Sequence, residues 1–435
     1  MKFDYNKEPS RDILCIDCKS FYASVECVER GLHPLKTMLV VMSNADNAGG
    51  LVLAASPLAK KTLGISNVTR KKDIPDHKDL LIVPPRMNLY MKKNAEINQI
   101  YKSFVTSEDH HVFSVDESFL DVTNSLSYFN CQTAYELARL IQIKVQQETG
   151  IYTTVGIGSN PLLAKLALDN EAKNAPDFKA EWRYKDVQEK VWSIHSMTEF
   201  CGIGEKTRLR LLGMGVRSIE ELATSDYYRL KSQLGVIGEQ LYAHANGIDR
   251  SFLGDYQPPK EKSLGNSQVL PETYTSQLKI ELVLTEIVDQ VASRLRKQNV
   301  QTQLVSVYVG YPKGYLDQEN KSGFNRQQKI LATNTTKVLV KETIALFRKH
   351  YTNQEVRNIG VSFGKLTYST IIQLDLFSDG EEQVKDNNLD FLIDRIRGKY
   401  GFTSIVHATS MLEGATAINR AGLVGGHAGG MEGMS

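Results

Sequence analysis

Three acidic residues stand beside apolar runs, where an unpaired carboxylate is costly to bury. Asp17 ends the run ILCID, and Asp116 and Glu117 interrupt the segment FSVDESFLDV. A charge in such a position must meet solvent, a partner or a metal ion. Carboxylates that converge from separate strands supply the hard oxygen ligands that Mg²⁺ prefers. Taken alone, the acid pair also fits a hairpin turn with solvated side chains.

Two cysteines flank Asp17 in a C-x-x-C pattern, which is also typical of redox pairs and zinc sites. They are Cys15 and Cys18. Positions three apart in a strand point to opposite faces, so the two thiols cannot hold one metal ion. The sequence has no second C-x-x-C and no histidine pair at zinc spacing. A redox pair would begin a helix, whereas Cys15 lies inside the apolar run. We therefore interpret the pattern as chance.

The segments around the acids alternate between strands and helices. Strands are predicted at 12–17, 37–43, 50–56, 110–115, 118–123 and 152–158, and helices at 57–64, 86–104, 133–148 and 160–173. This order predicts a mixed α+β domain with a central antiparallel sheet that holds the acids.

The remaining chain divides into a helical region and a second α/β domain. Residues 181–255 contain no convincing strand, and the polar segment GDYQPPKEK that follows is a plausible linker. Strands and helices then follow in the order β-α-β-β-α-β, which is the split βαβ pattern. Residues 260–371 hold 16 Lys and Arg against 9 Asp and Glu, a net charge of +7, whereas the whole chain carries only +2. Concentrated positive charge favours phosphate binding.

Bulk composition sets limits on the class of protein. A length of 435 residues indicates two to four domains, and the 41% hydrophobic content is enough for a sizeable core. Five cysteines are too few for a disulfide framework. The N-terminus lacks a signal-peptide pattern, and no run approaches the roughly 18 apolar residues of a membrane helix. We expect a cytoplasmic protein without a membrane partner.

Three motifs together carry a family resemblance. The segments DCKSFYASVE, SVDESFLDV and VGIGSNPLLAKLALDNEAK resemble, in order and spacing, the catalytic core of the Y-family translesion DNA polymerases. The likeness is closest to the UmuC-like branch (the polymerase V catalytic subunit) in its Gram-positive or plasmid-borne form. It runs from about Asp12 to about Phe377.

This resemblance implies a multidomain α+β architecture. A palm with a central antiparallel sheet would occupy 1–18 and 84–180, and small fingers would occupy 19–83. A helical thumb with a helix-hairpin-helix would span 181–255, and a βαββαβ little finger would span 262–371. Residues 372–435 would hold a clamp-binding motif and a C-terminal tail, whose Gly-rich end is expected to be flexible.

The resemblance also assigns roles at the reaction centre. Asp17, Asp116 and Glu117 match the carboxylates that hold two Mg²⁺ ions, and Cys18 matches a residue whose backbone carbonyl binds metal. Tyr22, five residues after Asp17, matches the steric gate. An aromatic ring under the sugar leaves no room for a 2′-OH, the group that distinguishes ribonucleotides.

Binding of the dNTP would use backbone amides and lysines. The amides around Ser20 and Phe21 begin a helix, where they could hold the triphosphate. Lys61, three residues before Gly64, and Lys173 match basic residues that contact phosphates. Two positions depart from the family pattern: Leu58 stands where many relatives have Tyr, and Lys19 stands where many have a second acid.

Two further segments resemble macromolecular binding motifs. The GIG turn resembles a helix-hairpin-helix, whose glycines let the N–H groups of Gly202, Ile203 and Gly204 approach a DNA phosphate. The segment QLDLF resembles the bacterial sliding-clamp-binding pentapeptide, although a last edge strand is an alternative. Its anchoring residues are Gln373, Leu374, Leu376 and Phe377. The segment DFLIDRIRGKYG predicts an amphipathic helix, which could bind a recombinase filament or an accessory subunit.

The predicted function is error-prone, DNA-directed DNA synthesis past template lesions, with primer-template DNA and dNTP as partners. Two alternatives remain open at this stage. One is a catalytically inactive, DNA-binding regulator of the damage response with the same fold. The other is a different palm-type nucleotidyl enzyme, such as a cyclase. The intact set of acids argues against the first, and the helix-hairpin-helix and basic domain argue against the second.

Overall fold

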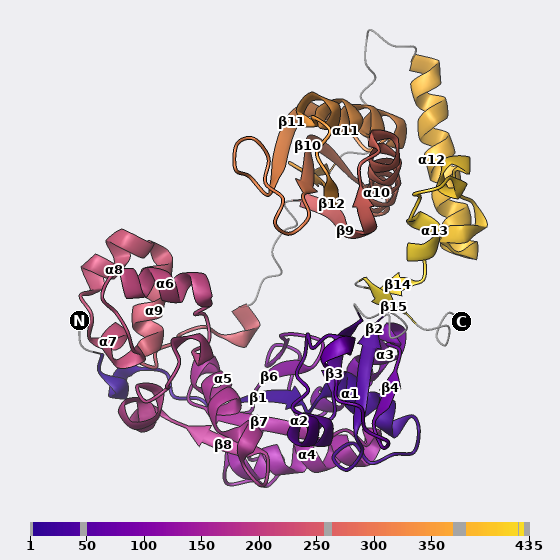
Figure 1. Cartoon of the computed structure of the whole chain (residues 1–435). Helices are drawn as coiled ribbons and strands as arrows, with labels where there is room; N and C mark the ends of the chain where they lie inside the picture. Colours follow the sequence, from indigo (N-terminus) through magenta and orange to yellow (C-terminus); the bar gives the residue numbers. More distant parts are fainter. Residues whose placement is uncertain (1–2, 44–49, 256–262, 369–379, 425, 430–435) are drawn as a thin grey trace. The chain divides into compact units, whose positions relative to one another are not determined.

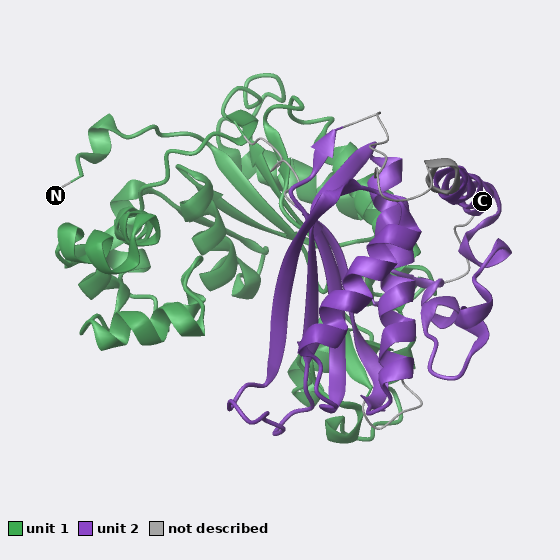
Figure 2. Cartoon of the chain, turned by 90° about the horizontal axis from the view of Figure 1, so that it is seen from above, with its two compact units in different colours: residues 1–257, 427–435 green, residues 258–426 purple. Residues whose placement is uncertain are grey.

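The computed structural model describes residues 3–43, 50–255, 263–368, 380–424 and 426–429. The chain forms two compact units, and each is described here by itself (Figures 1 and 2). One contains Met1–Gln257 with His427–Ser435, and the other contains Pro258–Gly426. No helix among the described residues is long and apolar enough to span a membrane.

The first unit is built on a five-stranded sheet in the order β5-β6-β1-β7-β8. The central strand β1 (Ile13–Cys18) is buried except at Asp17, and it runs antiparallel to both neighbours. The other strands are β5 (His110–Val112), β6 (Glu117–Asp121), β7 (Thr153–Gly158) and β8 (Lys179–Trp182). The predicted central antiparallel sheet is therefore confirmed, with β8 added in parallel beside β7.

Helices cover both faces of this sheet. α5 (Pro161–Asn170) begins at Asn160, whose side chain accepts a hydrogen bond from the Leu163 N–H at 2.9 Å. On the other face, Ser118 of β6 donates to Asn98 of α3 (Met87–Tyr101) at 3.0 Å. α4 (Ala134–Thr149) packs against α3 and β7.

Two glycines of β7 let α5 lie directly on the sheet. A Cβ atom at Gly156 would stand 2.1 Å from the carbonyl oxygen of Ala164, and one at Gly158 would stand 2.2 Å from the Ala164 nitrogen. No side chain fits at such distances, so α5 depends on glycine at both positions. This close contact fixes the distance between α5 and the sheet, and with it the position of Lys165, the residue after Ala164.

The fingers region adds a small sheet in the order β3-β2-β4. Its strands are β2 (Leu39–Ser43), β3 (Leu51–Ala55) and β4 (Leu81–Val83), and its helices are α1 (Phe21–Val28) and α2 (Pro57–Leu63). α2 begins at Ser56, which caps the Ala59 N–H, and ends at Gly64 with a φ of 64°. These caps agree with the predicted helix at 57–64.

Four short helices form the helical region predicted between 181 and 255. They are α6 (Glu205–Gly213), α7 (Ile219–Thr224), α8 (Tyr227–Leu234) and α9 (Val236–Ala245). Their hydrophobic core is continuous with the buried side of α5, including Leu163 and Leu166. The predicted boundaries between palm, fingers and thumb stay predictions, because all three regions belong to one compact unit.

The second unit confirms the predicted βαββαβ order. Its four long strands form a sheet in the order β11-β10-β12-β9, and α10 and α11 pack on it. The elements are β9 (Ser263–Tyr274), α10 (Gln277–Lys297), β10 (Val300–Gly310), β11 (Gly323–Thr333), α11 (Thr336–His350), β12 (Val356–Gly364) and β13 (Thr367–Tyr368).

The helix predicted at DFLIDRIRGKYG is confirmed as part of α12, but the C-terminal segment is not a separate tail, because much of it packs on the second unit. It forms α12 (Gly380–Tyr400), α13 (Ala417–Arg420), β14 (Leu423–Val424) and β15 (His427–Ala428). Arg296 of α10 binds Asp394 of α12 at 2.6 Å, and Arg397 of α12 binds Asp289 of α10 at 2.7 Å. Such pairs join residues about a hundred positions apart, so local composition does not reveal them. The clamp-like segment, residues 373–377, lies outside the described residues.

Candidate active site

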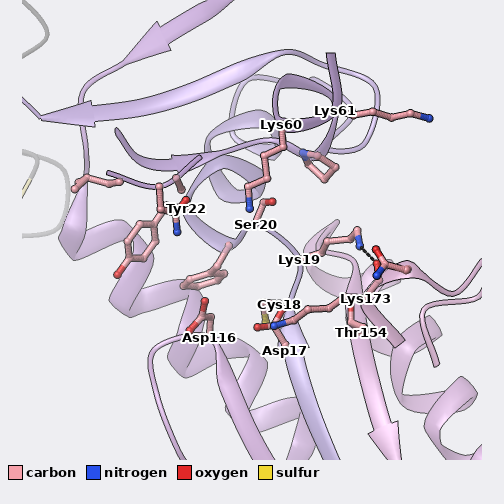
Figure 3. A pocket seen from close by; sticks show the side chains of 16 residues that line it. Asp17, Cys18, Lys19, Ser20, Tyr22, Lys60, Lys61, Asp116, Thr154 and Lys173 are labelled. Atoms are coloured by element: carbon pink, nitrogen blue, oxygen red, sulfur yellow. Dashed lines mark hydrogen bonds between the residues drawn. The ribbon is translucent and has the colours of Figure 1, made fainter. Parts of the chain in front are cut away.

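A cavity of about 790 Å³ lies between the main sheet and the fingers elements of the first unit. Residues from β1, the start of α1, α2 and the turn after α5 meet around it (Figure 3). It is lined by Asp17, Cys18, Lys19, Ser20, Phe21, Tyr22, Leu53, Ala54, Pro57, Lys60, Lys61, Asn67, Asp116, Thr154, Lys173 and Asn174. All the residues predicted for the reaction centre and the nucleotide, except Glu117, therefore share one cavity.

The register of the sheet brings the predicted acids together. Asp17 of β1 lies directly opposite Glu117 of β6, and the Cys18 N–H donates to the Asp116 carbonyl at 2.9 Å. Asp116 accepts a hydrogen bond from Ser114 at 2.8 Å and lines the cavity with Asp17. The Glu117 carboxylate instead binds the ammonium of Lys165 on α5 at 2.5 Å.

The nearby lysines do not fully offset the burial of Asp17 and the charges of its neighbouring acids. Burial, together with the neighbouring charges of Asp116 and Glu117, raises the pKa of Asp17 to about 7, although Lys173 opposes the shift. Carboxylates that repel one another in this way would be relieved by a bound cation. The donors at the cavity wall are oxygen atoms, as Mg²⁺ requires.

The carboxylates are not arranged as a closed metal-binding cluster. Within the described ranges, no three His, Cys, Asp or Glu side chains are grouped so that they could hold a metal ion. The Lys165 ammonium binds the third acid, Glu117, whereas Asp17 and Asp116 line the cavity. Asp17 and Asp116 fit an oxygen-ligated cation, and the metal-binding roles of Glu117 and the Cys18 carbonyl stay predictions.

The two cysteines beside Asp17 do not form a redox pair or a zinc site. Both are buried free thiols, and Cys15 belongs to the hydrophobic core together with α5. Burial is the main cause that raises the pKa of both thiols well above the usual range. Protonated, buried thiols of this kind are inert. The interpretation of the C-x-x-C pattern as chance is confirmed.

Tyr22 lies on the cavity wall, and its ring packs against Tyr90. α1 begins after Ser20, which has a left-handed φ of 50°, and Tyr22 stacks on Tyr90 with ring centroids 4.5 Å apart. The Tyr90 hydroxyl donates to Glu26 at 2.6 Å, and Arg86 donates to both oxygens of the same buried carboxylate at 3.0 and 2.7 Å. Tyr90 is therefore fixed at both its ring face and its hydroxyl, which gives Tyr22 a rigid support.

The lysines of the cavity differ in direction. Lys60 points into the cavity, whereas the neighbouring Lys61 extends away from it (Figure 3). Lys173 lies near Asp17 and donates to Asp169 at 2.8 Å. Although burial opposes its charged form, the carboxylates of Asp17 and Asp169 raise the pKa of Lys173. Positive charge thus faces the two acids across the cavity.

Comparison with known proteins assigns this arrangement to a family. Residues 16–169 match the impB/mucB/samB family, and residues 261–376 match the C-terminal domain of that family. A relative from Bacillus subtilis (strain 168), UvrX, whose name refers to UV-damage repair, is 39% identical over 425 residues, 98% of this chain and 99% of the relative. The chain belongs to the UmuC-like branch of the Y-family polymerases.

Two other similar proteins agree with this family. DNA polymerase IV 2 of Bacillus subtilis (strain 168) is 33% identical over 418 residues, which cover 95% of this chain and 98% of the relative. The solved structure of the Y-family DNA polymerase chimera Dbh-Dpo4(243-245)-Dbh superimposes with a TM-score of 0.64 at 23% identity. That match covers 82% of this chain and 100% of the chimera and supports the shared fold.

The GIG turn of this Y-family chain has the geometry that a close approach requires. Gly202 has a φ of 94°, and nothing lies within 4 Å of a Cβ placed there. Ile203 is buried and anchors the turn, while Gly204 is exposed and precedes the first turn of α6. The prediction is wrong for Ile203, because its N–H already donates to the Phe200 carbonyl at 3.1 Å, which leaves the N–H groups of the two exposed glycines as the candidates for an oxygen ligand. Contact with a DNA phosphate stays a prediction.

Lys60 is the functional candidate that sequence reasoning missed. Counting back from Gly64 selects Lys61, whereas the capped start at Ser56 fixes the rotation of α2 and turns Lys60 inward. α2 has only seven residues and a single buried one, Ala59, so its apolar pattern could not define its inward face. The capping serine was the signal available in the sequence.

Proposed function

We propose that this chain is an error-prone, DNA-directed DNA polymerase that carries out translesion synthesis. In the proposed reaction a primer 3′-OH attacks the α-phosphate of a dNTP, and pyrophosphate leaves. The observation that carries the proposal is the cavity in which Asp17 and Asp116 face a group of lysines, with Tyr22 on the wall. A cavity with acids on one side and lysines on the other suits a triphosphate with bound metal ions, because the acids can bind the metal and the lysines the phosphates.

The acids would hold two Mg²⁺ ions. Asp17 and Asp116 provide oxygen donors at the cavity wall, while Glu117 and the Cys18 carbonyl would complete the set. When bound, such ions stabilise the attacking and leaving oxygens of an in-line displacement. Glu117 is paired with Lys165 in this structure, so its carboxylate would have to exchange this ammonium for a bound ion.

Other side chains would position the nucleotide. The ammonium of Lys60 and that of Lys173 would neutralise the phosphates, a role that the resemblance assigns to Lys61 instead of Lys60. Amides at the start of α1, around Ser20 and Phe21, would accept a phosphate at a helix N-terminus. Tyr22, supported by Tyr90, would exclude the 2′-OH of a ribonucleotide.

DNA would be held by surfaces outside the cavity. The exposed turn at Gly202–Gly204 would bind a phosphate of the duplex. In the second unit, a groove of about 440 Å³ is lined by glycines, Ser and Asn residues of β9, β10, β11 and β12, together with Tyr308 and Val361. Such a surface, in a domain with a net positive charge, suits a DNA backbone. The segment Gln373–Phe377 would bind a sliding clamp.

Primer extension on undamaged and lesion-containing templates tests the proposal. Asp116→Ala and Glu117→Ala should abolish extension, while Glu148→Ala, which removes an exposed acid of α4, should not. Normal extension by the first two variants would refute the mechanism and favour an inactive DNA-binding regulator. Extension that always stops at the lesion would refute translesion synthesis alone.

Two narrower tests address selectivity and clamp binding. Tyr22→Ala should raise ribonucleotide incorporation by about 10²-fold, since the ring no longer fills the space of the 2′-OH. Unchanged sugar discrimination would remove Tyr22 as the gate. Deletion of Gln373–Phe377 should abolish capture of the clamp while basal extension persists. Retained clamp binding would contradict the assignment of that segment.

A further inference from the structure

Lys19 occupies an unexpected place in the cavity. It directly follows β1, two residues after Asp17, and its N–H donates to the Tyr152 carbonyl at 2.9 Å. The backbone is therefore fixed beside β7, and the side chain turns toward the segment after α5 and lines the cavity (Figure 3). A lysine so close to a proposed metal-binding acid needs a physical reason.

The Lys19 side chain is held in a defined position at two points. Its ammonium donates to the Lys173 carbonyl at 3.2 Å and lies 4.3 Å from the ring centre of Phe178. Phe178 itself has a φ of 57°, a conformation that is costly for a residue other than glycine. An aromatic face and a carbonyl orient the ammonium without neutralising its charge.

No carboxylate among the described residues lies close enough to Lys19 to form a salt bridge with it. In the described part of the chain, Lys19 forms no salt bridge, whereas Lys173 binds Asp169 and Lys165 binds Glu117. Its residue surface is only partly exposed. A partly buried cation without a carboxylate partner favours an anionic ligand.

We propose that Lys19 is a third phosphate-binding lysine, which contacts the triphosphate of the incoming nucleotide together with Lys60 and Lys173. The three ammonium groups line one cavity, and a triphosphate carries enough negative charge to engage all of them. This inference rests on the proposed function, because it places the dNTP in that cavity. It adds a residue at the position where the family pattern has an acid.

The test measures binding without turnover. Binding of inorganic tripolyphosphate, and of a dNTP with Ca²⁺ in place of Mg²⁺, is followed by calorimetry for Lys19→Met, Lys19→Arg and Lys60→Met. Lys19→Met should weaken both ligands roughly 10- to 100-fold, the range for a lost charge-assisted hydrogen bond. Lys19→Arg should restore most of the affinity. Lys144→Met, which removes an exposed lysine of α4, should bind as the unaltered protein does.

The possible failures are distinguishable. Unchanged binding by Lys19→Met, with a clear loss in Lys60→Met, overturns the role of Lys19 and leaves the proposed nucleotide site intact. Equal losses in Lys19→Met and Lys19→Arg also overturn the inference, because Lys19 would then only hold the segment around Lys173 and Phe178. Binding that no lysine variant weakens refutes the cavity as the nucleotide site.

Discussion

Two regions of this molecule bury acidic side chains in opposite ways. In the second unit, Asp289 accepts hydrogen bonds or ion pairs from Arg397 at 2.7 Å and His407 at 3.7 Å. These partners outweigh burial and lower the pKa of Asp289. In the first unit, Asp17 faces other acids, and its pKa is raised to about 7, chiefly by burial.

The difference separates charges that hold the fold from charges that await a ligand. When an arginine pairs with a buried carboxylate, ionisation of the carboxylate stabilises the folded protein, and no ligand is needed. When burial and neighbouring acids oppose the ionisation of a carboxylate, its charged form destabilises the folded protein. Protonation or a bound cation removes that cost. Functional sites are therefore expected where buried charges remain uncompensated. The following predictions test this contrast, from the largest expected effect to the smallest.

Asp116→Asn should separate activity from stability most clearly. We expect a loss of primer extension on the order of 10³-fold, because a proposed ligand of the reacting metal is removed. Thermal stability should be unchanged or higher, because the substitution removes repulsion between Asp116 and Asp17. Extension rates and thermal melting of the same preparation check both halves. A marked drop in the melting temperature would show that Asp116 is structural.

Arg296→Met should have the reverse effect. The Arg296 side chain is 2% exposed and pairs with Asp390 and Asp394, so its loss leaves two carboxylates without their partner. We expect a fall of about 3 kcal/mol in the free energy of unfolding. Arg348→Met is the control: its pair with Glu281 is 59% exposed on the arginine side, so solvent screens it and its loss should cost clearly less than the loss of Arg296. Denaturant unfolding decides, and equal effects would contradict the contrast.

Lys60→Met and Lys61→Met should differ although the two lysines are neighbours. Lys60 points into the cavity and Lys61 away from it, so only the first should raise the KM for dNTP, by roughly tenfold. Steady-state extension at varied dNTP concentration provides the measurement. A larger effect for Lys61→Met would restore the assignment made from Gly64.

The free energy of unfolding of the second unit should depend weakly on pH through His407. It should fall as pH rises, whereas a carboxylate with a lowered pKa contributes stability that falls as pH falls. The hydrogen bond to Asp289 raises the pKa of His407 above its usual value, against burial and Arg397. Stability from this contact is fully present below the unfolded pKa and is lost as pH rises through the folded pKa. Since half of the His407 surface is exposed, we expect less than about 1 kcal/mol between about pH 6 and about pH 8. His407→Gln should remove the dependence; a variant that keeps it would place the titration elsewhere.

The sequence predicted the acids well because strands impose simple rules. Apolar runs defined β1 and β6, and their pairing sets Asp17 beside Glu117 and Asp116. The motif order then predicted that these acids belong to one reaction centre. Tyr22 was also predicted to lie there, because its position depends only on the first turn of α1.

Features that depend on rotation or long-range contact escaped prediction. The seven-residue helix α2 left Lys60 and Lys61 indistinguishable until its orientation was known. The engagement of Glu117 by Lys165 joins β6 to α5 across 48 positions, and no local pattern indicates it. The packing of α12 likewise depends on Arg296, a buried arginine inside an otherwise amphipathic helix.

The glycines of β7 have a consequence for how this molecule can move. Gly156 and Gly158 seat α5 on the sheet with no intervening side chain, and the opposite side of α5 continues into the core of the helical region. α5 therefore packs on the sheet on one side and shares a hydrophobic core with Ile203 on the other, and it carries Lys165, which pairs with Glu117. If the Gly202–Gly204 turn binds duplex as proposed, a load on that turn would pass through this shared core toward the Lys165–Glu117 pair.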